Sequence, residues 1–311
     1  MSVRKGMLIC VFLIGALSVM VAGGKKESPN AAGADHAEKP VVAVSILPQQ
    51  YFVERIAGDR VSVLVLVGPG QSPHSYEPTP KQMSSLANAG AWILSATDFE
   101  IGLEPKIAAQ LPNLLIVDGT EGVAFRQMQE WEHDDDGDAA DAESENHHHD
   151  ANIDRHTWLG HEPAKILAGH VRDTLIKTDP EGKSIYEENY KALIQDIDSV
   201  YGELATELTP LAGKTVLVYH PAFGYLFDSL GIRQESVETG GKEPTAQALS
   251  ALIEKAKAEH VPVIFVQAQF PVNAAQNVAE AVGAEVVPLD PLAPDWLENI
   301  KRIGDALKKS L

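Results

Sequence analysis

Short apolar runs alternate with amphipathic stretches along most of the chain. Residues 41–47 and 61–67 are rich in β-branched side chains, and Gly68 and Pro69 close the second run, so both are typical of buried strands. In the first half, further strands are predicted at 92–96 and 114–117, and helices at 49–57, 81–89, 104–110 and 163–177. This alternation predicts a parallel sheet with helices on both faces.

The same alternation returns in the C-terminal part of the chain. Strands are predicted at 215–219, 263–267 and 285–288, and helices at 222–229, 245–259, 274–282 and 295–309. A chain of 311 residues is long enough for two such units. The predicted fold class is therefore α/β, with two lobes that each contain a parallel sheet flanked by helices.

The longest helical pattern lies between the two lobes, at 184–208. Its apolar residues recur at steps of three and four and form one stripe: Tyr186, Tyr190, Leu193, Ile197, Val200, Leu204 and Leu208. Ser184 and Glu187 fit a capping box, although Asp179 and Pro180 offer an earlier start. Such a helix is roughly 37 Å long and would make a rigid link. The expected organisation is an N-terminal lobe at 41–178, a linking helix at 179–210 and a C-terminal lobe at 211–311.

The N-terminus has the pattern of a secretory signal. Arg4 and Lys5 precede an apolar stretch at 7–22, and small residues at 22–24 offer a cleavage site. We expect a signal peptide at 1–24, a flexible tether at 25–40 and a periplasmic or other extracytoplasmic location. The less favoured alternative is an uncleaved membrane anchor, because the apolar stretch is short for a membrane span. Cys10, the only cysteine, lies too early for a convincing lipoprotein site, so the mature chain would bind metals through nitrogen and oxygen.

The charge of the chain changes the range of partners to consider. The formal net charge is -19, which argues against nucleic acid and suits a protein that handles cations. Residues 132–150 are rich in Asp and Glu, lack Lys and Arg, and have no apolar face, so an exposed loop is predicted. This loop also carries four histidines, His133, His147, His148 and His149.

Three other histidines lie at breaks between predicted elements, beside bulky apolar residues. They are His74 in the loop after the strand at 61–67, His156 before Thr-Trp-Leu, and His220 at the end of the strand at 215–219. Three imidazoles and one oxygen, which Asp290 could supply, would complete a tetrahedral zinc site. An isolated histidine at a strand end is more often a hydrogen-bonded core or surface residue, and Asp290 before a proline could be a turn residue. The residues alone therefore give only a metal-site hypothesis.

Four motifs in order strengthen this hypothesis. Gly-Gln-Ser-Pro-His74-Ser-Tyr-Glu-Pro-Thr-Pro, His156-Thr-Trp-Leu, His220-Pro-Ala-Phe-Gly-Tyr and Leu-Asp290-Pro-Leu closely resemble the solute-binding proteins of bacterial ABC importers for zinc and manganese. The resemblance covers roughly residues 41–311. It implies that the metal lies in a cleft between the two lobes, with His74 and His156 from the first and His220 and Asp290 from the second. It also implies a monomeric transport protein, not an enzyme, whose partner is an ABC permease.

The resemblance also bears on the choice of metal. Manganese members of the family typically have a carboxylate where His220 stands, and three imidazoles favour Zn²⁺ over Mn²⁺. Zinc is therefore expected, as a transported ligand, with manganese or iron as the alternative. Water or another carboxylate could replace Asp290 as the fourth ligand. The acidic histidine-rich loop resembles a metal-collecting loop of zinc members.

Some interpretations remain open. Glu77 could contact His74 from behind or could make a local loop hydrogen bond. His161 could be an additional ligand but fits better as a helix-start residue, and Arg155 stands where the family often has Pro. From other functional classes, a zinc-dependent hydrolase and a metal-buffering surface adhesin remain alternatives, although the chain has no His-Glu-x-x-His motif.

Overall fold

The computed structural model describes residues 39–128, 153–238, 245–267, 269–270 and 272–311. The predicted signal peptide, nearly all of the tether, and the loop histidines His133, His147, His148 and His149 lie outside these residues. The predictions about them stay untested. Within the described part of the chain, no helix is both long enough and apolar enough to cross a lipid bilayer.

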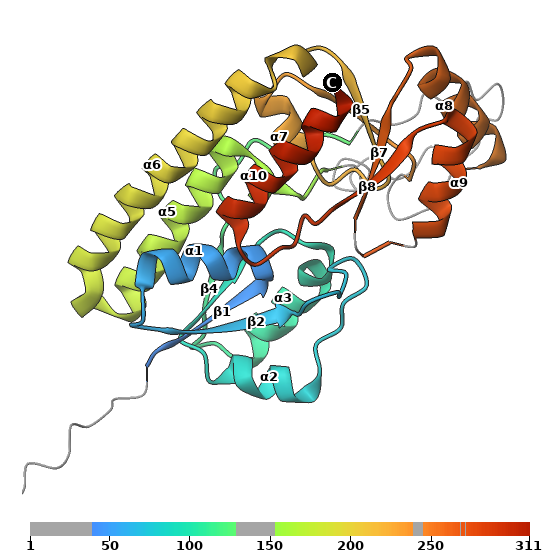
Figure 1. Cartoon of the computed structure of the whole chain (residues 1–311). Helices are drawn as coiled ribbons and strands as arrows, with labels where there is room; N and C mark the ends of the chain where they lie inside the picture. The colour runs from blue at the N-terminus through green and yellow to red at the C-terminus, as the bar shows by residue number, and fades with distance from the viewer. Residues whose placement is uncertain (1–38, 129–152, 239–244, 268, 271) are drawn as a thin grey trace, which may run out of the picture. The chain divides into compact units, whose positions relative to one another are not determined.

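The first sheet is parallel, with strand order β2-β1-β3-β4 (Figure 1). Its strands are β1 (Val41–Ile46), β2 (Ser62–Val67), β3 (Ala91–Leu94) and β4 (Leu115–Asp118), and its helices are α1 (Leu47–Ala57), α2 (Pro80–Ala87), α3 (Asp98–Gln110) and α5 (His161–Thr178). The buried amide of Gln49 accepts from the backbone of β1 and donates to the carbonyls of Ile93 and Leu94 in β3. One side chain thus joins the ends of the two central strands.

The second sheet repeats this order as β6-β5-β7-β8. Its elements are β5 (Thr215–Val218), α7 (Gly224–Ser229), β6 (Arg233–Ser236), α8 (Ala246–Ala258), β7 (Val263–Gln267), α9 (Val272–Val282), β8 (Glu285–Leu289) and α10 (Trp296–Leu307). Strand β6 was not predicted, because its sequence Arg-Gln-Glu-Ser is polar and it lies at the edge of the sheet. Helix α3 also begins earlier than the predicted start at residue 104, since Thr97 and Glu100 form a capping box.

Helix α6 (Lys183–Glu207) lies between the two sheets in the sequence. It packs against helices that precede it in the chain and against one that follows it. It contacts α1 and α5, which precede it, and α10, which follows the second sheet (Figure 1). Its predicted stripe faces the core through Tyr186, Leu193, Ile197, Val200 and Leu204. The predicted fold class, two α/β lobes with parallel sheets and one long linking helix, is confirmed.

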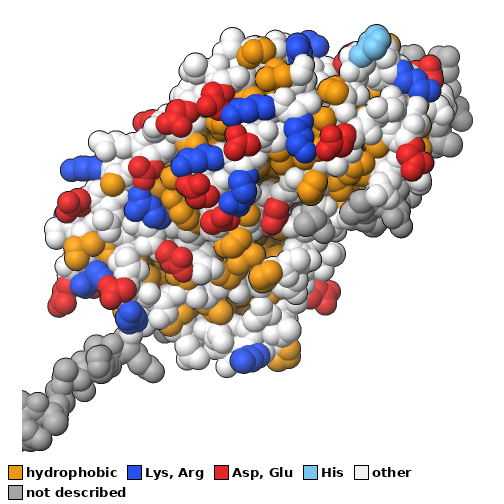
Figure 2. All heavy atoms as spheres, viewed as in Figure 1, with side chains coloured by type: hydrophobic (Ala, Val, Ile, Leu, Met, Phe, Trp, Pro, Cys, Tyr) orange, Lys and Arg blue, Asp and Glu red, His pale blue; other side chains and the backbone are white. Residues whose placement is uncertain are grey.

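The hydrophobic core is continuous from the first sheet into the second lobe. Trp296 of α10 packs on Phe52 of α1 with ring centroids 4.8 Å apart, and its indole N–H donates to the carbonyl of Trp158 at 2.8 Å. A second cluster fills the space between the second sheet and helices α8 and α9. On the outer face over α6 and α10, acidic and basic side chains are interspersed (Figure 2). The apolar packing therefore lies beneath a solvated charged surface.

Gly119, which follows β4, provides a test of this packing. A Cβ atom there would lie 2.5 Å from the backbone oxygen of Leu94, which cannot rotate away. We expect Gly119→Ala to lower the free energy of unfolding by about 1–3 kcal/mol. Gly102→Ala in α3 has no atom within 4 Å and should be neutral or stabilising by about 0.5–1 kcal/mol. Denaturant unfolding measures both, and equal stability of the two variants would contradict the packing described.

Candidate metal centre

Three imidazoles converge on one point. The Nε2 atom of His220 lies 3.2 Å from Nε2 of His74 and 3.2 Å from Nε2 of His156. One ligand atom from each ring lies within 4.8 Å of the others. His74 lies in the loop after β2, His220 follows β5, and His156 precedes a short 3-10 turn at Thr157–Leu159. Two of the rings thus occupy the carboxyl ends of parallel strands, where ligands bind in open α/β sheets.

A carboxylate lies behind each of these rings, at Nδ1. The pairs are His74 with Asp98 at 2.5 Å, His156 with Asp154 at 2.9 Å and His220 with Glu238 at 2.5 Å. A carboxylate accepts a hydrogen bond from Nδ1–H, so the ring proton is held on Nδ1 and the lone pair is left on Nε2. All three rings therefore present a metal-binding nitrogen toward the same point.

The backbone of the buried ligands is also fixed. The side chain of Gln267 accepts from the N–H of His220 and donates to its carbonyl. The indole of Trp158, two residues after His156, donates to the carbonyl of Pro291 at 2.8 Å. His156 and His220 are 5% and 4% exposed in their side chains, whereas His74 is 33% exposed. Two of the three rings thus lie in the interior, and the third lies on the solvent side.

The space between the rings is small. The imidazoles border a cavity of about 20 Å³, whose other walls include Trp158, Phe270 and Leu292. The ring of His220 stacks on Phe270 with centroids 4.7 Å apart. One water molecule occupies a cavity of roughly 10–15 Å³ or more, so this one suits a single ion or water.

The electrostatics favour a neutral imidazole at His220 and ionised carboxylates at Asp98 and Asp154. Burial lowers the pKa of His220 to about 4, against the opposing effect of its hydrogen bond to Glu238. The hydrogen bond from His74 lowers the pKa of Asp98. Burial raises the pKa of Asp154, but His156 and Arg126 outweigh it and leave that pKa below its usual range. Neutral imidazole is the form that coordinates a metal.

Asp290 is not part of the histidine cluster in this structure. Its Oδ1 accepts from the amide of Gln269 at 3.1 Å and from the N–H of Leu292 at 2.9 Å. Among the described residues, the group of His, Cys, Asp and Glu whose ligand atoms meet contains only the three histidines. The predicted fourth protein ligand is therefore held by local hydrogen bonds that follow from its turn position after β8.

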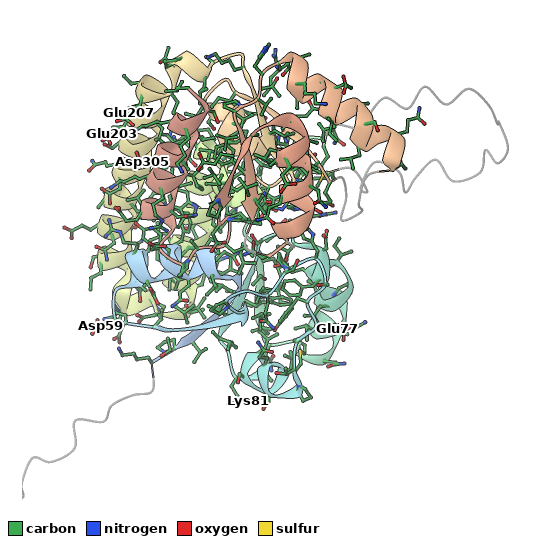
Figure 3. All side chains as sticks on the ribbon, turned by 45° about the vertical axis from the view of Figure 1, so that its right-hand side comes forward. Asp59, Glu77, Lys81, Glu203, Glu207 and Asp305 are labelled. Carbon is green, nitrogen blue, oxygen red and sulfur yellow. The ribbon has the colours of Figure 1, made fainter. Side chains whose placement is uncertain are left out.

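Two further predicted roles can be compared with the structure. Glu77 is exposed at the outer edge of the first lobe (Figure 3), and the carboxylate at Nδ1 of His74 is that of Asp98, so of the two roles left open for Glu77 the contact with His74 is taken by another residue. His161 begins α5, where its ring stacks on Tyr201 and its Nε2 contacts Asp198 at 2.7 Å. It is a helix-start residue outside the cluster.

The sequence reasoning missed the three carboxylates, although two left a signal. Asp98 is the first residue of α3, directly after the N-cap residue Thr97 and four residues after the end of β3. Asp154 lies two residues before His156 and accepts from its backbone N–H at 3.0 Å, a common Asp turn. Glu238 follows β6, the strand that was not predicted, so nothing in the sequence pattern placed it at the cluster.

The lowered pKa of His220 predicts how acid affects the metal-free protein. Between pH about 6.5 and 4 the unfolded state binds a proton at this ring and the folded state does not, so the free energy of unfolding falls as the pH falls. His220→Asn should remove this contribution, which is at most about 3 kcal/mol. Urea titrations in chelator at several pH values measure it, with His260→Asn as control. An unchanged pH slope in His220→Asn would contradict the burial argument.

Comparisons with known proteins identify the family of the chain. The family described as zinc-uptake complex component A, periplasmic, matches residues 42–310. The high-affinity zinc uptake system protein ZnuA of Bacillus subtilis (strain 168) is 26% identical over 97% of both chains. The manganese-binding lipoprotein MntA of Halalkalibacterium halodurans is 26% identical over 82% of this chain and 79% of its own. A crystal structure of ZnuA has a TM-score of 0.78 and 32% identity over 88% of this chain and 99% of that one. The protein therefore belongs to the zinc-uptake component A family of periplasmic solute-binding proteins, the zinc and manganese family that its motifs resemble.

Proposed function

We propose that this protein captures Zn²⁺ outside the cytoplasm and delivers it to an ABC permease for import. The convergence of three Nε2 atoms carries the proposal. Bonds of about 2.0–2.1 Å in a tetrahedral zinc site separate the ligand nitrogens by roughly 3.3 Å. Nε2 of His220 lies 3.2 Å from Nε2 of His74 and of His156, and these separations fit this value with almost no movement of the rings.

The ligand types favour zinc over manganese. Mn²⁺ is the weakest binder of the divalent series and prefers oxygen, whereas imidazole suits Zn²⁺. Residue 220 offers an imidazole nitrogen where a carboxylate would favour manganese. The carboxylate of Glu238 is buried and contacts the other nitrogen of this ring, Nδ1. We propose water as the fourth ligand, because Asp290 is engaged by Gln269 and Leu292.

The small size of the cavity favours metal capture over the alternative function of a zinc hydrolase. A cavity of about 20 Å³ has no room for an organic substrate beside the metal. A substrate would have to displace Phe270 or Trp158, which line the space. Capture of a bare cation needs only the room that is present. Export by the N-terminal signal and collection of metal by the loop at 132–150 complete the proposal, and both concern residues outside the described ones.

Metal counting tests the site directly. Stripped protein offered equal Zn²⁺ and Mn²⁺ should retain one tightly held Zn²⁺ per chain by mass spectrometry, because three imidazoles select zinc. His220→Ala should lose it, while His161→Ala should keep it. A variant without residues 132–150 should also keep it, since a long loop loses chain entropy on closing around a metal.

Two outcomes of this competition would overturn the site. One is preferential retention of Mn²⁺, and the other is zinc retention by His220→Ala equal to that of the parent. Delivery is tested separately by growth in zinc-poor medium, where a deletion strain should be rescued by the parent protein and not by His220→Ala. Hydrolysis of ester or peptide substrates by the zinc-loaded protein would favour the enzyme class instead.

The carboxylates behind the rings generate a second prediction. Glu238→Gln replaces a charged acceptor at Nδ1 by a neutral one, so the affinity for Zn²⁺ should fall by roughly 10–100-fold. Asp198→Asn is the matched control, because Asp198 pairs with His161 in the same way outside the cluster. Competition with a chelator of known affinity measures both. If the two variants bind zinc equally well, the carboxylates do not support coordination.

A further inference from the structure

The carboxylate of Asp154 is the most deeply buried charge at the metal centre. Its side chain is 0% exposed. Oδ1 accepts from both the Nδ1 and the backbone N–H of His156, and Oδ2 accepts from a guanidinium N–H of Arg126 at 2.8 Å. A buried carboxylate needs partners for both of its oxygens. Arg126 binds the oxygen of Asp154 that His156 leaves free, and so holds the carboxylate where it contacts His156.

The same guanidinium also reaches the second lobe. Its Nε donates to Asp228 of α7 at 2.9 Å. The Arg126 side chain is 18% exposed and that of Asp228 is 58% exposed, so the bond to Asp228 is partly screened by solvent. The bond to Asp154 is the stronger of the two, and the bond to Asp228 gives the guanidinium its orientation.

The first turn of α7 is shaped to receive Arg126. At Gly224 a Cβ atom would lie 1.9 Å from a terminal nitrogen of Arg126 and 2.6 Å from Oδ2 of Asp154. The hydroxyl of Tyr225 accepts from the backbone N–H of Arg126 at 3.0 Å and donates to the carbonyl of Asp154 at 2.9 Å. Only glycine at position 224 leaves space for this arrangement.

We propose that Arg126 is a positioning residue for the metal centre, which ties the His156 ligand of the first lobe to helix α7 of the second. This inference rests on the proposed zinc binding and extends it. Because one guanidinium serves both contacts, a shift of α7 away from Arg126 withdraws support from Asp154 and frees the ring of His156. Movement of the second lobe is thereby coupled to the hold on the metal at a ligand of the first lobe.

Zinc dissociation from the full chain, measured by stopped flow with excess chelator, tests the proposal. Arg126→Gln should speed dissociation by roughly 10–100-fold, as expected for loss of a group that supports a ligand. Arg126→Lys should restore part of the effect, because an ammonium can pair with Asp154 but lacks the second arm. Gly224→Ala removes no polar group, yet it should also speed zinc dissociation, because the added Cβ displaces the guanidinium of Arg126.

Arg60→Gln is the matched control. Arg60 pairs with Asp179 through two nitrogens in the first lobe, and neither residue contacts the cluster. The Arg60→Gln variant should have lower thermal stability than the parent and the same rate of zinc dissociation. The double variant Arg126→Gln with Gly224→Ala should dissociate no faster than Arg126→Gln alone, because both changes remove the same support.

A second measurement needs no metal. Nitrogen NMR of metal-free protein should show His156 as a single tautomer with its proton on Nδ1, and Arg126→Gln should mix the tautomers. Zinc dissociation within twofold of the parent in both Arg126→Gln and Gly224→Ala, with an unchanged His156 tautomer, would overturn the proposal. If the parent retains no zinc, the proposed function fails, and the tautomer measurement alone then decides the role of Arg126.

Discussion

The structure depends on bringing three imidazole lone pairs to one point without letting them separate. Nitrogens 3.2 Å apart that all present lone pairs repel one another when nothing lies between them. Each ring could escape by rotating or by moving its proton to Nε2. The carboxylates at Nδ1 oppose both changes, since each fixes the tautomer and the orientation of its ring. The folding energy of the rest of the chain holds this arrangement in place, and a cation at the centre turns the repulsion into attraction.

In each lobe a supporting carboxylate lies at the carboxyl end of a parallel strand. Asp98 follows β3 and Glu238 follows β6, so both lie at the carboxyl ends of parallel strands, as do His74 and His220. Parallel sheets direct their connecting loops to this edge, which explains why residues far apart in sequence meet there. Interior amides complete the arrangement: Gln49 joins β1 to β3, and Gln267 pairs with the backbone of His220.

The sequence predicted the parts of the fold that follow from apolar patterning. Buried strands such as β1 and β7, the stripe of α6 and the breaks that carry the three histidines all have strong local signals. Strand β6 has none, because an edge strand needs little apolar surface, and Glu238 was missed with it. The role of Arg126 became visible only in three dimensions, since pairing between distant residues leaves no periodic trace. The motif at Asp290 indicated a ligand, whereas in this structure Oδ1 of Asp290 accepts hydrogen bonds from Gln269 and Leu292.

The three histidines are unequally exposed, so solvent reaches the centre from the side of His74. His156 and His220 are almost fully covered, while a third of the His74 side chain meets solvent. For an ion held by all three rings, water can compete most easily for the bond to His74. Exchange would then proceed stepwise, with the loop after β2 releasing first and the two interior rings keeping a half-bound ion. The residence time of such an ion would then be set at two separate steps, the faster one at the solvent-exposed ring of His74.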